Sequence, residues 1–159
     1  MGTINQNWPR WVFASICKHF DGKRQGIPLY IEGQTRNTRN QEDFLELRVD
    51  GPQFTELSHN EWKIYIEVNI LVQSVMDDKN YHRIHQNVGI VAAAFSDIEV
   101  FKYGKLPGDN QELWTCIQLV QNERSRQQIN IFHFGQVDKQ TRLMQAAVEG
   151  HYQTFLKGE

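Results

Sequence analysis

EWKIYIEVNILVQSV, residues 61–75, alternates large apolar residues with mostly polar ones along its length. Because successive side chains of a strand point to opposite faces of a sheet, this period of two predicts a strand with one face against a core and the other face largely polar. The segment exceeds the usual strand length of about five or six residues, and we expect it to lie next to a partner. The alternating apolar positions are Trp62, Ile64, Ile66, Val68, Ile70 and Val72.

Six further segments have strand character, and turn residues or polar stretches separate them. Five of them are residues 27–33, 44–52, 98–103, 113–120 and 129–135. The sixth, residues 142–156 (RLMQAAVEGHYQTFL), fits both a period of two and an i, i+4 row. Gly150 in its middle weakens a helix by about 1 kcal/mol relative to alanine, so a strand is favoured and a helix is the alternative.

Two segments have helical spacing. The first runs from about Pro9, which suits the first turn of a helix, to Phe20, with Asn7 as the candidate cap and Asp21-Gly22 as its end. The second follows the candidate cap Asp78 and has a stripe suited to covering a sheet. The two apolar stripes are Val12, Phe13, Ile16, Cys17 and Phe20, and then Tyr81, Ile84, Val88, Val91 and Phe95.

This order of elements differs from a regular βαβ alternation. We therefore predict an α+β fold, a mainly antiparallel β-sheet with an N-terminal helix and a second covering helix. With 159 residues, 40% apolar and 23% charged, the chain is expected to form a single domain over residues 1–159. The net charge of −2 does not favour a general nucleic-acid or membrane-surface binder.

The sequence contains neither an apolar run long enough to cross a membrane nor the basic-then-apolar order of a secretory signal, so we expect a soluble protein used inside a cell. Cys17 and Cys116 lie in apolar surroundings, one in the first helix and one in a strand. We interpret both as reduced core residues, and a disulfide between them is the alternative.

The stretch GQTRNTRNQED, residues 33–43, separates two predicted strands and contains no large apolar residue. It exceeds the two to five residues or so that a tight hairpin needs. Two interpretations stay open for this protruding polar loop. It is either a solvated surface connection or an arm that lies on another subunit, where Arg36 and Arg39 would form the contacts.

Chemistry-bearing patterns are sparse. His82 and His85 stand three residues apart on the second helix, and His59, His133 and His151 could join them, but the spacing matches no standard zinc pattern and HExxH is absent, so we expect no metal. Glu46, Glu67, Glu99 and Glu149 each fall in a predicted strand and are expected on its wet face. Nucleophile and phosphate-loop motifs are also absent. We therefore expect no catalytic residue and no cofactor.

The pattern of elements resembles the tail-terminator proteins of tailed bacteriophages, small proteins of the virion neck. The matching segments are WVFASICKHF, IPLYIEGQTRNTRNQED, LELRVDGPQFTELSHNEWKIYIEVNILVQSV, YHRIHQNVGIVAAAF and the closing strands up to QAAVEGHYQTFL. The resemblance spans most of the chain and depends on length, order and strand character. It implies an N-terminal helix, a strand with a long polar loop, a long strand hairpin, a covering helix and further strands.

The resemblance also implies a function. Such proteins form rings, usually hexameric, that cap the tail tube and face the head-completion or connector proteins, with no catalytic residues. For this chain it implies a virion protein assembled in the host cytoplasm, with DNA only passing through the lumen and no membrane partner. Candidate intersubunit contacts are Arg36, Arg39, Arg124 and Arg126.

Three alternatives come from other classes. One is another tail-completion or baseplate protein. The second is a small hydrolase or metal-dependent enzyme that uses His82, His85 and a carboxylate such as Glu67. The third is a monomeric module that binds a peptide or nucleic acid on its sheet face or edge.

Overall fold

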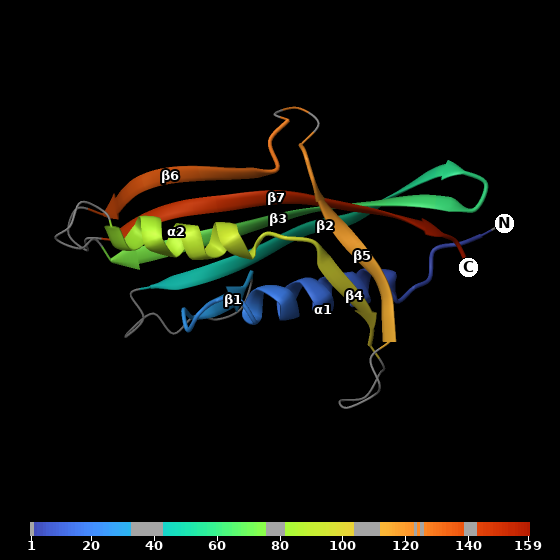
Figure 1. The fold of residues 1–159 in the computed structure, drawn as a ribbon, viewed down its shortest axis with the longest axis horizontal. Coiled ribbons are helices and arrows are strands. Elements are labelled where there is room, and N and C mark those ends of the chain that lie inside the picture. The colour runs from blue at the N-terminus through green and yellow to red at the C-terminus, as the bar shows by residue number, and fades with distance from the viewer. Residues whose placement is uncertain are drawn as a thin grey trace.

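The computed structural model describes residues 2–32, 43–75, 82–103, 112–122, 124, 126–138 and 143–159. Two helices and seven strands follow one another in the described chain (Figure 1). The fold is α+β, as predicted. The elements are α1 (Trp8–Asp21), β1 (Leu29–Ile31), β2 (Phe44–Ser58), β3 (Glu61–Val75), α2 (His82–Ala94), β4 (Ile98–Lys102), β5 (Glu112–Val120), β6 (Ile129–Asp138) and β7 (Leu143–Lys157).

All seven strands form one sheet in the order β1-β2-β3-β7-β5-β4, and β6 also pairs with β7. Three strands of 15 residues each, β2, β3 and β7, run side by side along the long axis of the molecule (Figure 1). β3 pairs with β2 on one side and with β7 on the other, antiparallel in both cases. The long alternating segment is therefore the central strand of the sheet.

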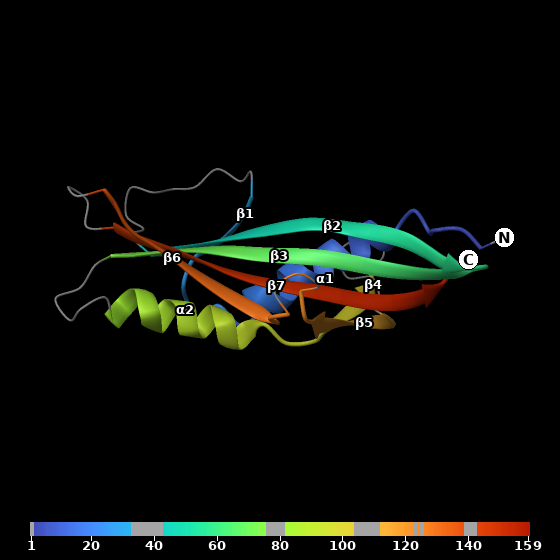
Figure 2. The same cartoon turned by 90° about the horizontal axis from the view of Figure 1, so that it is seen from above.

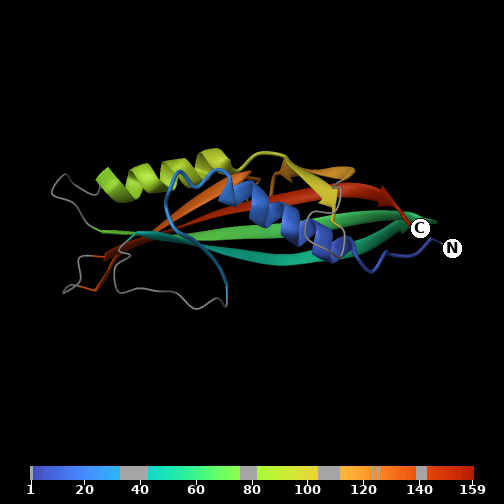
Figure 3. The same cartoon turned by 90° about the horizontal axis from the view of Figure 1, so that it is seen from below.

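The predicted alternation of β3 is confirmed. From Ile64 to Val72 every second side chain is buried, and the intervening ones are half-buried. The buried side of the sheet forms one hydrophobic core with α1 and α2, which lie on the same face of the three long strands (Figures 2 and 3). Ile84, Val88 and Val91 of α2 are buried as their spacing predicted, whereas Phe13 of the α1 stripe is 40% exposed.

β1 and β2 are parallel, which explains part of the length of the connection between them. Leu29 lies opposite Leu45, and Ile31 lies opposite Leu47. The chain that leaves Ile31 must therefore return past the length of β1 before it enters β2 at Phe44. A parallel pair always needs such a crossover, typically of about a dozen residues or more. The connection between β1 and β2 is therefore a crossover, whose length cannot be judged against that of a tight hairpin. Residues 33–42, with Arg36 and Arg39, lie outside the described part of the chain.

The ambiguous last segment is a strand, as favoured from the sequence. The even-numbered residues of β7 from Met144 to Thr154 face the core, and Gly150 is one of them. A Cβ atom at Gly150 would lie 2.4 Å from Cδ1 of Phe95, which itself stacks near Phe20 and Tyr152. The glycine that weakened the helical interpretation is thus required by the close approach of a core phenyl ring.

The outer side of β7 is shared by two strands. β6 pairs with β7 from Leu143 to Gly150, and β5 takes over at His151 and continues to Gln153. His151 therefore occupies the point where one neighbouring strand ends and the other begins. The connection between β5 and β6, residues 121–128, leaves the sheet at this point.

Asp43 joins three elements at the start of β2. Its Oδ1 accepts a hydrogen bond from the backbone N–H of Val75 at 3.1 Å, and its Oδ2 forms a 2.6 Å ion pair with Arg83 of α2. Asn87 of α2 donates a 2.7 Å hydrogen bond to Oγ of Ser74. These contacts fix the first half of α2 against the ends of β2 and β3.

Two sequence-based expectations need correction. Cys116 is exposed and is not a core residue, because in β5 the neighbouring Ile117 points inward. Cys17 is half-buried, and neither cysteine forms a disulfide. Asn7 does occupy the cap position of α1, but its side chain forms no capping hydrogen bond. The candidate cap Asp78 lies outside the described residues.

Candidate functional site: a buried histidine on the polar face

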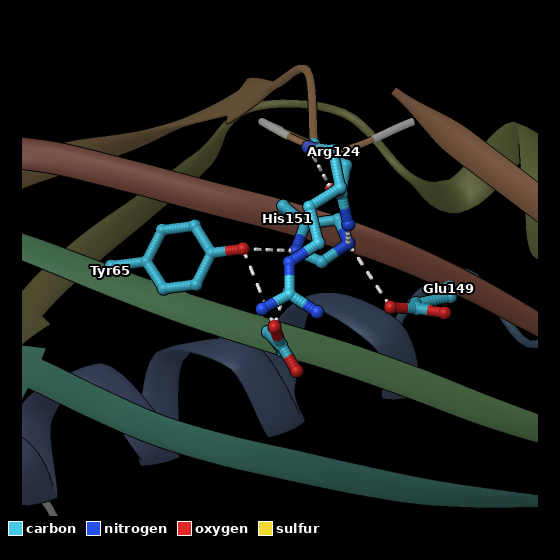
Figure 4. Close-up of polar contacts among 6 residues, drawn as sticks. Tyr65, Arg124, Glu149 and His151 are labelled. Atoms are coloured by element: carbon cyan, nitrogen blue, oxygen red, sulfur yellow. Dashed lines mark hydrogen bonds and ion pairs between the residues drawn. The ribbon is translucent and has the colours of Figure 1, made fainter. Parts of the chain in front are cut away.

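The face of the sheet opposite the helices carries a cluster of polar side chains centred on His151. The residues of this His151 cluster come from β3, from β7 and from the connection after β5. Strand register places Glu67 of β3 directly opposite His151 of β7, and both side chains point away from the core. The cluster consists of Tyr65, Glu67, Asn122, Arg124, Glu149 and His151. Figure 4 shows these contacts, with Tyr65, Arg124, Glu149 and His151 labelled.

The imidazole of His151 is fully buried, and polar atoms contact both of its nitrogens. The Tyr65 hydroxyl forms a short hydrogen bond with Nδ1, and the two rings stack with centroids 5.8 Å apart. Glu149 places Oε1 3.1 Å from Nε2. Tyr65 and Glu149 reach the histidine from opposite sides (Figure 4). Since a buried polar group is costly without partners, these contacts explain how the sheet accommodates His151.

The Tyr65 hydroxyl also contacts Glu67. The distance from its oxygen to Oε1 of Glu67 is 3.4 Å, and this carboxylate oxygen is 3.7 Å from Nδ1 of His151. Tyr65, His151 and the two glutamates therefore form a chain along which a proton can be shared. Such a chain resembles the base and orienting groups of acid–base sites.

Asn122 connects His151 to the β5–β6 connection. Its Nδ2 lies 2.8 Å from Nε2 of His151, and its Oδ1 accepts a 2.8 Å hydrogen bond from the backbone N–H of Arg124. The backbone of Asn122 also closes a turn, because its N–H donates to the carbonyl of Gln127 and its carbonyl accepts from the N–H of Arg126. The Asn122 side chain thus links this 122–127 turn, described at Asn122, Arg124, Arg126 and Gln127, to the sheet.

Two polar hollows flank the cluster and share Glu67. The first, of about 440 Å³, is lined by Gln53, Thr55, Lys63, Tyr65, Glu67, Asn122 and Arg124. The second, of about 360 Å³, is lined by Glu32, Arg48, Val49, Asp50, Glu67, Asn69 and Glu149. Both hollows are open and mostly polar, unlike the largely apolar pockets that enclose small organic ligands.

The structure keeps apart His82, His85 and Glu67, the residues expected to act together in a small hydrolase or metal-dependent enzyme. His82 is exposed on α2, on the core side of the sheet, while Glu67 faces the opposite side. His85 instead contacts His133 of β6, with ring centroids 4.6 Å apart. Burial and the neighbouring His85 charge lower the pKa of His133. Within the described part of the chain, no three His, Cys, Asp or Glu side chains are grouped to hold a metal ion.

The four strand glutamates differ in environment. Glu99 is exposed, as expected for a wet face, but Glu46 is buried and forms a 3.1 Å ion pair with Arg48. Glu67 and Glu149 belong to the His151 cluster. Sequence reasoning named these two carboxylates and His151 separately, and only the strand register brings them together.

Of the four candidate intersubunit arginines, two are described. Arg124 and Arg126 are exposed in the 122–127 turn, and Arg126 has a left-handed backbone conformation with φ of 58°. The structure therefore brings these two together on one turn. Arg124 is also a member of the His151 cluster (Figure 4).

A scan against protein-family models found no match, and a search of curated proteins also found none. Neither α1 nor α2, the two helices of the described chain, is long and apolar enough to cross a membrane.

Proposed function

We propose that this protein is a non-enzymatic structural protein of a tailed-phage virion. It forms a ring at the neck, terminates the tail tube and joins it to the head-completion proteins. Its partners are other copies of itself, the tail-tube protein and the connector proteins, and DNA passes only through the lumen. Assembly takes place in the host cytoplasm.

The order of elements supports the neck assignment. An N-terminal helix, a strand with a long connection, a hairpin of two 15-residue strands, a covering helix and closing strands follow one another, as the resemblance to tail terminators implies. The 15-residue strands form an extended sheet, and among the described residues β1 pairs with the outer side of β2 only at Leu45–Leu47, so the rest of that side is an edge available to a neighbour.

The observation that best supports self-assembly is the exposed apolar surface of the outer strand β6. Ile131, Phe132 and Phe134 are 46%, 46% and 61% exposed, and within the described residues β6 pairs only with β7. An exposed apolar edge strand is an aggregation hazard unless another chain or element covers it. A neighbouring subunit that covers β6 would bury these three side chains at a contact repeated around the ring.

Electron microscopy tests this proposal with a matched pair of variants. We expect negative-stain images of the wild-type protein, purified or in virions, to show rings or neck-localised density. Phe134→Lys should abolish ring incorporation, while Phe155→Lys should preserve it, because Phe155 has nearly the same exposure, 59%, but lies near the end of β7. Both variants should unfold within about 0.5 kcal/mol of wild type.

A protein that stays monomeric and is absent from virions would refute the proposal. Rings that form equally well with Phe134→Lys would instead refute only the role of β6. Specific antibody labelling at the baseplate rather than at the neck would favour the alternative of another tail-completion or baseplate protein.

A further inference from the structure

Nε2 of His151 has two polar neighbours, one that needs a lone pair on this nitrogen and one that needs a proton on it. Asn122 Nδ2, 2.8 Å away, is a hydrogen-bond donor and needs a lone pair on the ring nitrogen. Glu149 Oε1, 3.1 Å away, is an acceptor and needs a proton on the same nitrogen. The orientation of the Asn122 amide is fixed, because its Oδ1 accepts from the Arg124 backbone N–H.

With a neutral imidazole, the hydrogen bonds form one consistent chain. Asn122 donates to Nε2, Nδ1–H donates to the Tyr65 oxygen, and the Tyr65 O–H donates to Glu67. Each ring nitrogen then has one hydrogen-bond partner, and Glu149 Oε1 lies 3.1 Å from Nε2 without a proton between the two atoms. In this state the side chain of Asn122 holds the 122–127 turn against the sheet.

With a protonated imidazole, both ring nitrogens are donors. Nε2–H then donates to Glu149, which gains a charge-assisted hydrogen bond, and the amide N–H of Asn122 faces another N–H group. The Asn122 contact is lost because two donors cannot bond to each other. Protonation thus exchanges a contact with the turn for a contact within β7.

We propose that His151 is a proton-controlled tether for the turn that begins at Asn122: the neutral imidazole accepts from Asn122, whose Oδ1 holds the Arg124 backbone N–H, and protonation breaks the contact between Asn122 and the imidazole. This inference does not depend on ring assembly. Titratable and charged groups surround the tether on every side: Tyr65 and Glu67 from β3, Glu149 from β7, Arg124 from the turn, Lys63 beside Tyr65 in the first hollow, and Glu32, Arg48 and Asp50 in the second hollow.

Amide hydrogen exchange measured by NMR on the full chain tests the tether. The Arg124 amide is the reporter, because its acceptor is the Asn122 side chain. We expect its protection factor, corrected for intrinsic exchange, to fall roughly three- to tenfold on acidification, the loss typical of one hydrogen bond. The fall should follow the titration of the His151 imidazole resonances in the same sample. The Gly22 amide, which donates to Lys18 at the end of α1, serves as the internal control and should stay unchanged.

Asn122→Asp provides the sharpest variant. Its carboxylate still accepts from the Arg124 N–H but now pairs with the protonated imidazole, so protection of Arg124 should rise on acidification and reverse the wild-type trend. His151→Gln should make protection independent of pH, and if that variant does not fold, Asn122→Asp alone decides. Two results would overturn the tether: Arg124 protection in the wild type that does not fall as the His151 imidazole becomes protonated, or a wild-type trend retained in Asn122→Asp.

Discussion

Replacing Gly150 with alanine tests whether the core packs as described. The added Cβ would lie 2.4 and 2.6 Å from two carbons of the Phe95 ring and 3.3 Å from Cδ1 of Leu119. Phe95 is only 5% exposed and lies between Phe20 and Tyr152, with ring centroids 5.0 and 6.4 Å away, so the ring has little room to move. Inserting a methyl group into such a core costs about 1–3 kcal/mol.

The substitution also brings a gain, since a strand residue other than glycine loses less entropy on folding, by about 0.5–1 kcal/mol. The net effect of Gly150→Ala should be a loss on the order of 1–2 kcal/mol, which lowers the melting temperature by roughly 2–8 °C in a chain of this size. Urea unfolding and a thermal melt measure both values. The control is Gly89→Ala on the exposed side of α2, where a Cβ meets nothing within 4 Å and a small gain is expected.

A double-mutant cycle shows whether Phe95 causes the loss. Phe95→Leu shortens the side chain that the new methyl would meet, so it should cost less in the Gly150→Ala background than in the wild type, by a coupling of about 1 kcal/mol or more. Gly150→Ala as stable as wild type, or a coupling near zero, would refute the close approach of the Phe95 ring to β7.

Three further predictions concern other parts of the chain. Asp43→Ala should lower the free energy of unfolding by about 1.5–3 kcal/mol in urea titrations, because it removes the carboxylate that pairs with Arg83 and accepts from the Val75 N–H. Asp21→Ala is the control: it breaks an exposed ion pair with Arg24 and should change the free energy of unfolding by no more than about 0.5 kcal/mol. Burial raises the pKa of the Cys17 thiol from 9.0 to about 11, so the unfolded state loses this proton at a lower pH than the folded state. The melting temperature should therefore fall as the pH rises from 9 to about 11, and it should fall less steeply in Cys17→Ala. Replacing Arg36 and Arg39 with alanine should change the unfolding free energy by no more than about 0.5 kcal/mol but reduce incorporation into particles, and normal incorporation would show that the loop is only a connection.

Local periodicity was enough to predict most of the elements. The alternation from Trp62 to Val72 identified the central strand, and the row of Ile84, Val88 and Val91 identified the covering helix, because each pattern records which side chains a single element buries. The last strand was harder, since Met144, Val148 and Tyr152 fit two periods at once. Only the antiparallel partners on both sides of β7 decide between them.

Pairing between distant strands was the information that the sequence did not contain. The parallel arrangement of β1 and β2 leaves no local mark, so their connection was compared with the wrong kind of turn. The His151 cluster depends on the same kind of information. Glu67 and His151 are far apart in the chain, and their juxtaposition follows from the register of β3 and β7. Cys116 was assigned to the core because its neighbours are apolar, although the side chain points outward.

The position of β7 also has a consequence for synthesis of the protein on the ribosome. In the described part of the chain, β7 is the second neighbour of β3, and β5 and β6 connect to the long strands through β7. While the ribosome is still producing residues before Leu143, the nascent chain can pair β2 with β3 and β4 with β5, but β5 and β6 lack the strand that joins them to β3. The apolar side chains of β6 therefore cannot be presented on a finished sheet until β7 has emerged. Completion of the fold and assembly of the β6 edge therefore depend on the same step of translation, the emergence of β7.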